Sequence, residues 1–149
     1  MDEGILAAAI EKEIQAREFY TKLSQKITSK KAKQKISQMA KDEATHASVL
    51  SRRFSKLFQR DYTPKMTEVD PKFRIVESEI SSIETALQIV SLAISMENES
   101  IELYSEHLKE AEDSEDKKML KRLLNFEKGH RKKLQNQHDR LNKGFSWIS

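Results

Sequence analysis

Apolar residues recur along this chain at alternating three- and four-residue steps in four separate stretches. Such spacing places them on one face of an α-helix. The pattern therefore predicts helices at about residues 3–27, 30–58, 82–111 and 115–142. Each helix has one apolar stripe to bury, and mutual packing of the stripes indicates an all-α helical bundle.

Residues that favour helix ends stand between these stretches. Thr28-Ser29 is expected to cap the second helix, and Asp113-Ser114 the fourth. Ser81 and Glu84 have the spacing of a capping box for the third.

The lengths of the links predict the topology. Short links make the first and second helices antiparallel, and likewise the third and fourth, whereas about residues 59–81 form a long connection containing both prolines. We expect a four-helix bundle over residues 1–142 with one long crossover between helices 2 and 3. Residues 143–149 form an apolar tail, expected to pack on the bundle or on a second subunit.

One glutamate interrupts the middle of every apolar stripe, and two of the four are followed by a histidine three residues later. Three residues along a helix return to nearly the same face, so each histidine joins its glutamate on the buried side. These six positions are Glu13, Glu43, His46, Glu97, Glu127 and His130.

The pattern of glutamates and histidines occurs twice in the chain. Glu97 follows Glu13 by 84 residues, and the Glu127–His130 pair follows Glu43–His46 by the same interval. A duplicated helical hairpin is the simplest explanation, and it predicts an internal two-fold repeat with a nearly symmetric site.

Buried carboxylates are rare without a cation or strong hydrogen bonds, because desolvation costs several kcal/mol per ion. Two divalent ions would neutralise four carboxylates, so the pattern predicts a two-metal site inside the bundle. Each histidine and its glutamate would serve one metal, with one terminal and one bridging carboxylate for each. Oxygen and imidazole ligands suit iron or manganese, and zinc also fits. The alternative is a bundle whose charged side chains extend to the surface.

Tyr20 and Tyr104 lie two turns after Glu13 and Glu97. Each is either a core aromatic whose hydroxyl reaches a helix end or a donor that orients a carboxylate across the bundle.

Composition excludes several classes of function. The chain of 149 residues has no cysteine, which rules out disulfides, iron–sulfur clusters and Cys-based zinc sites. Its formal charge of +3 comes from interspersed charges and gives no indication of nucleic-acid binding. No apolar stretch approaches the ~20 residues of a membrane span, and the acidic N-terminus lacks the basic region of a signal peptide. We therefore expect a cytoplasmic protein.

With these residues in view, the chain resembles the di-iron domain of the rubrerythrin family, within the ferritin-like superfamily. The resemblance covers roughly residues 5–142. Its most specific parts are the segments 13–20 (EIQAREFY), 42–47 (DEATHA) and 126–130 (FEKGH), together with Glu97 and Tyr104. It implies a ferritin-like bundle in which the six glutamates and histidines bind two iron ions.

The resemblance also implies reduction of hydrogen peroxide or dioxygen by Fe(II), in a homo-oligomer such as a dimer. Rubrerythrins usually carry a rubredoxin domain with four cysteines, so here electrons would come from a separate donor such as a rubredoxin-like protein. A further ligand glutamate three residues after the third-helix one is replaced by Ser100. The remaining set is similar to the ferroxidase centre of bacterioferritins. Two alternatives therefore stand: a ferroxidase in an oligomeric assembly, and a non-catalytic metal-binding bundle that binds a protein partner.

Overall fold

Four helices account for nearly all of the described chain. The computed structural model describes residues 1–65 and 83–144, with α1 at Glu3–Lys26, α2 at Lys30–Phe58, α3 at Ile83–Glu110 and α4 at Ser114–Asn142. Every end lies within one residue of the bound predicted from the apolar periodicity.

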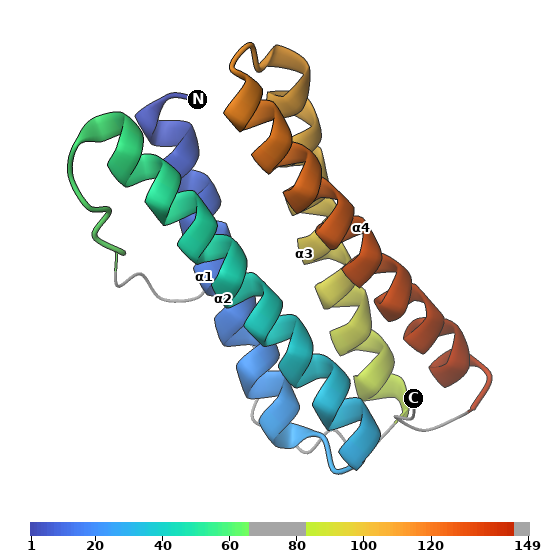
Figure 1. Ribbon diagram of the computed structural model, residues 1–149. Helices are drawn as coiled ribbons and strands as arrows, with labels where there is room; N and C mark the ends of the chain where they lie inside the picture. The colour runs from blue at the N-terminus through green and yellow to red at the C-terminus, as the bar shows by residue number, and fades with distance from the viewer. Residues whose placement is uncertain (66–82, 145–149) are drawn as a thin grey trace.

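The helices form two antiparallel hairpins. α1 packs mainly against α2, and α3 mainly against α4. Figure 1 shows the two hairpins side by side, with α2 ending at one end of the bundle and α3 beginning at the other. These positions of the two helix ends are the ones that the predicted topology, with one long crossover, requires. Residues 66–82 and the predicted tail at 145–149 lie outside the described residues.

The predicted caps of α2 and α4 are confirmed. Ser29 accepts a hydrogen bond from the backbone N–H of Ala32, and Asp113 accepts from those of Glu115 and Asp116. These bonds satisfy amide groups that the first turn of a helix leaves unpaired. The capping box expected at the start of α3 falls outside the described residues.

The internal repeat is visible in the helix bounds. α2 and α4 each have 29 residues, and both of their ends are related by the same 84-residue interval as the paired glutamates. α1 and α3 also end 84 residues apart. The two hairpins are therefore equivalent halves of the bundle.

The core consists of two apolar clusters with a polar layer between them. One cluster contains residues such as Leu23, Ile36 and Val90, and the other contains Leu6, Leu50 and Leu120, among others. Along each helix, the predicted glutamate lies between the residues of one cluster and those of the other. The apolar clusters thus keep solvent from both sides of the polar layer.

The three- and four-residue steps of α2 predict a buried position for Leu57, but this residue is 38% exposed and Phe54 occupies the core instead. A stripe of alternating three- and four-residue steps drifts relative to the 3.6-residue turn of a straight helix, so its last member rotates outward. Gly129, in the middle of α4, has open space where a Cβ would lie, so close packing does not require a glycine there.

Arg53 connects the two hairpins at one end of the bundle. Its guanidinium group donates to Asp116 at 2.8 Å and to Asp113 at 2.9 Å, and it also pairs with Glu115. Asp116 is buried and accepts a second ion pair from the terminal ammonium group of Met1 at 2.9 Å. A charged group on α2 is thereby held by the first turn of α4.

We expect Arg53→Ala to lower the free energy of unfolding by about 2 kcal/mol, because it removes hydrogen bonds between charged groups and leaves Asp116 less well paired. Urea unfolding followed by circular dichroism measures the change. Lys56→Ala is the matched control, since it pairs with Glu115 across exposed surface and should cost less than about 0.5 kcal/mol. Equal losses in the two variants would contradict this assignment.

None of the described helices combines the length and the apolar character needed to cross a membrane.

Candidate metal centre

The six predicted side chains meet in the polar layer at the middle of the bundle. α1 provides Glu13, α3 provides Glu97, and α2 and α4 each provide a glutamate followed by a histidine one turn later. None of the six residues is more than 4% exposed. These polar groups lie at the same level of the bundle because each occupies the middle of an apolar stripe.

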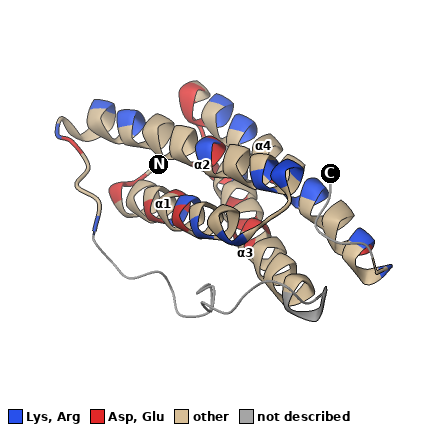
Figure 2. Ribbon diagram, turned by 90° about the horizontal axis from the view of Figure 1, so that it is seen from below, with Lys and Arg blue, Asp and Glu red and all other residues tan. Residues whose placement is uncertain are grey.

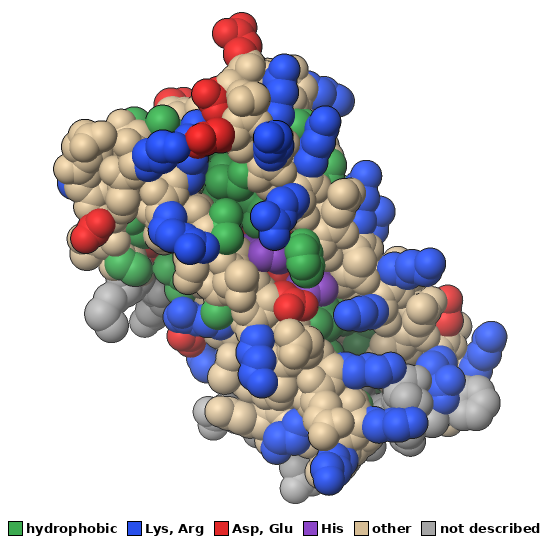
Figure 3. All heavy atoms as spheres, viewed as in Figure 1, with side chains coloured by type: hydrophobic (Ala, Val, Ile, Leu, Met, Phe, Trp, Pro, Cys, Tyr) green, Lys and Arg blue, Asp and Glu red, His purple; other side chains and the backbone are tan. Residues whose placement is uncertain are grey.

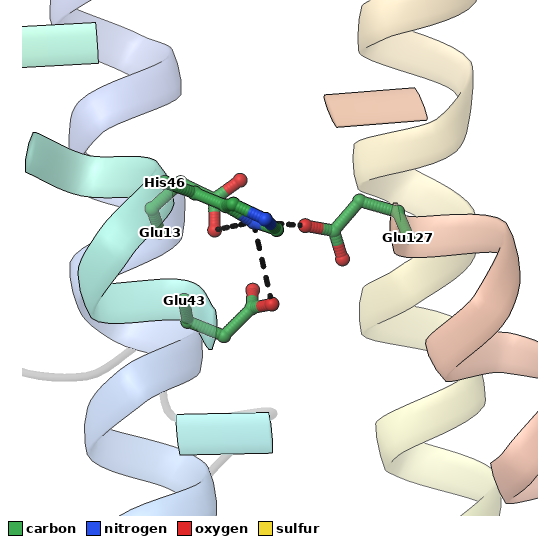
Figure 4. A group of neighbouring side chains, drawn as sticks. All are labelled: Glu13, Glu43, His46 and Glu127. Carbon is green, nitrogen blue, oxygen red and sulfur yellow. Dashed lines mark hydrogen bonds and ion pairs between the residues drawn. The ribbon is translucent and has the colours of Figure 1, made fainter. Parts of the chain in front are cut away.

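The side chains form two overlapping groups of four. Ligand atoms of Glu13, Glu43, His46 and Glu127 all lie within 4.8 Å of one another, and so do those of Glu43, Glu97, Glu127 and His130. Figure 4 shows the first group, with three side chains from α1 and α2 facing Glu127 of α4. Glu43 and Glu127 belong to both groups, so these two carboxylates would be available to both ions of a pair.

Both histidines turn Nδ1 toward the carboxylates. His46 Nδ1 lies 3.0 Å from Glu127 Oε1 and 3.6 Å from Glu43 Oε1. His130 Nδ1 lies 3.0 Å from Glu43 Oε1 and 3.6 Å from Glu127 Oε2. Each imidazole thus lies closer to the glutamate of the other hairpin than to the glutamate of its own hairpin. The contacts of the site therefore show the same two-fold symmetry as the fold.

Several buried atoms of the cluster form no well-aligned hydrogen bond, although His130 Nδ1 and Glu43 Oε1 lie only 3.0 Å apart. They are one carboxylate oxygen from each of the four glutamates and Nδ1 of His130. Unpaired buried polar atoms are costly, and four acidic groups facing one another add repulsion. Oxygen and imidazole nitrogen atoms are the donors that divalent iron, manganese and zinc accept. The residues present therefore fit a pair of such ions.

Burial sets the protonation of the cluster in the absence of metal. It raises the pKa of Glu13, Glu43 and Glu97 above the usual value, and neighbouring carboxyl groups raise it further. Burial lowers the pKa of His46, but contacts with Glu127 and Glu13 outweigh this effect and raise the pKa to about 9. Divalent cations favour the ionised carboxylates, so metal binding and proton loss are coupled here.

The two tyrosines reach carboxylates across the bundle. The hydroxyl group of Tyr20 on α1 donates to Glu97 on α3, and that of Tyr104 on α3 donates to Glu13 on α1. Both tyrosines are fully buried, and burial beside the carboxylates raises the pKa of each hydroxyl well above its usual value. The protonated hydroxyls fix the orientation of the two glutamates that belong to only one group each.

One contributing residue was not recognised from the sequence. Asp42 accepts a hydrogen bond from Nε2 of His130 at 2.9 Å, the arrangement that commonly orients a metal-binding imidazole. The position related to Asp42 by the 84-residue repeat is Phe126, whose ring packs edge-on against His46 at 5.0 Å. Comparison of the two halves would have singled out this pair of positions. An acidic residue precedes the motif in one half, and an aromatic residue precedes the otherwise identical motif in the other.

We expect Asp42→Ala to weaken binding of one metal ion by about 10- to 100-fold and to leave the other nearly unchanged, because only His130 loses its anchor. Titration of the metal-free protein with Mn(II) in a calorimeter measures the two affinities separately. Gln38→Ala provides a control, since Gln38 contacts Asp42 from the solvent side. Equal weakening of both ions would argue against an anchor specific to His130.

Comparisons with known proteins agree with this architecture. The family model described as Rubrerythrin matches residues 4–137. A hypothetical protein from Pyrococcus furiosus has a similar structure, with a TM-score of 0.84 and 26% identity over 95% of this chain and 90% of that chain. A search of curated proteins finds no match.

A bacterioferritin from Rhodobacter capsulatus, whose structure is described as having a metal-free dinuclear site and haem iron, matches with a TM-score of 0.74. Its identity is 22% over 96% of this chain and 88% of that chain, so the likeness concerns the fold alone. The fold is a ferritin-like four-helix bundle, and its glutamate–histidine cluster is compatible with a di-iron site. Because the family model spans most of its length, this chain belongs to the rubrerythrin family.

Proposed function

We propose that this protein is a non-haem di-iron oxidoreductase that uses Fe(II) to reduce hydrogen peroxide or dioxygen. The observation that carries the proposal is the sharing of Glu43 and Glu127 between the two groups of ligand atoms. Two shared carboxylates would hold two ions as a pair, and a pair of redox-active ions suits a two-electron reduction of a single small molecule.

Each part of the cluster has a role in this proposal. Glu13 and His46 would complete the ligand set of one ion, and Glu97 and His130 would complete that of the other. Four carboxylates balance the charge of two divalent ions. When bound, the iron pair supplies two electrons, one from each ion, which together with two protons convert one hydrogen peroxide molecule into two water molecules. The apolar clusters on either side exclude water from the layer.

Electrons must return to the centre after each turnover. The 149 residues contain no cysteine, so the four thiolate ligands of a rubredoxin-type iron site are not among them. A separate donor such as a rubredoxin-like protein fits this composition. We also propose that the protein works as a homo-oligomer such as a dimer, and that residues 1–142 form one ferritin-like di-iron bundle, with 143–149 as a tail.

Anaerobic loading with two Fe(II) ions per chain, followed by one equivalent of hydrogen peroxide, tests the activity. We expect the near-ultraviolet absorbance of ferric iron to rise within the mixing time of a stopped-flow instrument, with one peroxide consumed for every two Fe(II). The matched control is Glu97→Ala, which keeps the helix but removes a candidate ligand. Oxidation no faster than that of free Fe(II) in the same buffer would contradict the proposal.

Ser100 favours a second candidate, a ferroxidase that handles iron. It is a buried residue one turn after Glu97, where the rubrerythrin resemblance implies an additional glutamate. Without that glutamate the candidate ligands form a symmetric set of six, as in a ferroxidase centre. A ferroxidase of this kind would oxidise many Fe(II) ions per chain and retain them in a large assembly. Native mass spectrometry after iron loading distinguishes that result from a dimer containing two irons per chain.

A non-catalytic bundle that binds metal and a protein partner is the remaining candidate. It predicts two tightly bound ions whose Fe(II) reacts with neither peroxide nor dioxygen.

A further inference from the structure

A surface hollow lies directly outside His46, between α2 and α4. It has a volume of about 320 Å³, and we call it the α2–α4 hollow. Its apolar wall consists of Val49, Met119, Leu123 and Phe126, and His46 lies at its inner side. Figure 3 shows this face, where histidine atoms are visible between hydrophobic side chains and Lys and Arg side chains surround them. Concave apolar sites of this size are typical of small-molecule binding.

Phe126 makes the hollow unusual as a piece of surface. Its side chain is 47% exposed, although large aromatic residues usually bury more of their area. One edge of the ring packs on His46, and the remainder forms part of the wall. The exposed part of the ring is therefore available to contact a bound molecule.

Two basic and two acidic residues are part of the lining of the hollow. Lys118 and Arg122 line it one turn apart on α4, and neither forms an ion pair or hydrogen bond with any other residue in the described ranges 1–65 and 83–144. Both acidic residues of the lining are already engaged: Glu115 pairs with Arg53 and Lys56, and Asp42 accepts from His130. Lys and Arg recur along α4, as Figure 2 shows, so the two cations at the mouth belong to a generally basic helix.

The internal repeat provides a comparison within the same molecule. The positions 84 residues away from the apolar wall are Lys133, Lys35, Met39 and Asp42, so the equivalent wall is mostly charged. The two cations at the mouth correspond to Gln34 and Gln38. On that side the hollow lined by Lys35, Met39 and Lys133 has a volume of only about 30 Å³.

The metal-site motifs are the same in both halves, whereas the volumes of the two hollows differ about tenfold. The apolar wall and the unpaired cations are thus not a consequence of the bundle or of its six candidate ligands. Exposed apolar surface is normally disfavoured unless something binds to it.

We infer that the α2–α4 hollow binds a small amphipathic anion, such as an aromatic carboxylate. Its apolar body would pack against Phe126, Val49 and Leu123, and its anionic group would lie between Lys118 and Arg122. A molecule bound there covers the outer side of His46. The inference does not depend on the proposed oxidoreductase activity, because the hollow is formed by side chains alone.

Binding is tested on the full metal-free chain with 2-naphthoate as the probe. Titration followed by ¹⁵N–¹H NMR should shift the amide signals of residues 45–49 and 118–126, with a dissociation constant of about 1 mM or lower for a ligand of this size. 2-Naphthamide has the same rings without the charge, and it should bind at least about threefold more weakly, because exposed ion pairs contribute little each. Shifts scattered over the whole bundle, or none, would overturn the inference.

Two pairs of variants separate the contributions of charge and ring. Lys118→Glu with Arg122→Glu should weaken 2-naphthoate binding about tenfold or more, whereas Lys117→Glu with Lys121→Glu makes the same charge change on the same helix outside the hollow. Phe126→Ala should also reduce binding about tenfold, and Leu57→Ala, at another exposed apolar position, should not. Loss of binding in both charge-reversed pairs alike would show general attraction to a basic helix and would overturn a site in the hollow.

Failure of this binding would leave the iron proposal untouched. Conversely, a protein that binds the probe in the hollow but does not oxidise Fe(II) would refute the proposed activity alone.

Discussion

Divalent metal is expected to raise the midpoint of thermal unfolding of the metal-free protein by about 10–20 °C. An ion present at 100 times its dissociation constant stabilises the folded state by about 2.7 kcal/mol, so two ions contribute about 5 kcal/mol. For a chain of this size, each kcal/mol shifts the midpoint by about 2–4 °C. The physical reason lies in the polar layer, where buried carboxylate oxygens without hydrogen-bond partners and mutual repulsion destabilise the metal-free form.

Calorimetry or circular dichroism of the metal-free protein, with and without Mn(II) under the same buffer conditions, measures this shift. Addition of a chelator should reverse it. The doubly substituted Glu43→Ala and Glu127→Ala protein serves as the control, because it keeps the hairpins and lacks both shared carboxylates. A rise of the same size in that variant would place the stabilising ions elsewhere on the molecule.

The second large effect concerns the number of ions bound. Glu127→Ala should abolish tight binding of both ions, because this carboxylate belongs to both groups of ligand atoms. Glu13→Ala should abolish only one, since the group formed by Glu43, Glu97, Glu127 and His130 stays complete. We expect the dissociation constant of each affected ion to rise at least about 100-fold, more than for loss of a residue that only orients a ligand. Elemental analysis after gel filtration in Mn(II) gives the ratio directly.

The expected ratios are two ions per chain for the native protein, one for Glu13→Ala and none for Glu127→Ala. Glu102→Ala, at an exposed position of α3, should retain two. Equal losses from Glu13→Ala and Glu127→Ala would contradict the distinction between shared and unshared carboxylates.

Much of the bundle could be predicted because its determinants are local. The steps between apolar residues and the capping residues Ser29 and Asp113 are read along a single helix, and they place the helix ends within one residue. The level of the bundle at which the six candidate ligands meet could also be predicted, because each ligand lies in the middle of a stripe. The 84-residue repeat then fixed how the two halves correspond.

Features that depend on contacts between helices could not be predicted from the sequence in this way. The sequence identified four glutamates but did not say which two are shared, since that depends on how α2 and α4 face each other across the layer. Asp42 was missed because its partner His130 lies in the other hairpin. The α2–α4 hollow likewise arises from side chains of both helices. Leu57 was misplaced because the turn of a straight helix rotates the end of the stripe toward solvent.

The most direct measurement of the two-metal centre is anomalous diffraction from crystals of the protein loaded with Mn(II) or anaerobically with Fe(II). We expect two anomalous peaks per chain inside the bundle, one beside Glu13 and His46 and the other beside Glu97 and His130, with Glu43 and Glu127 contacting both. A single peak, or peaks only at surface carboxylates, would contradict a two-metal centre in this bundle.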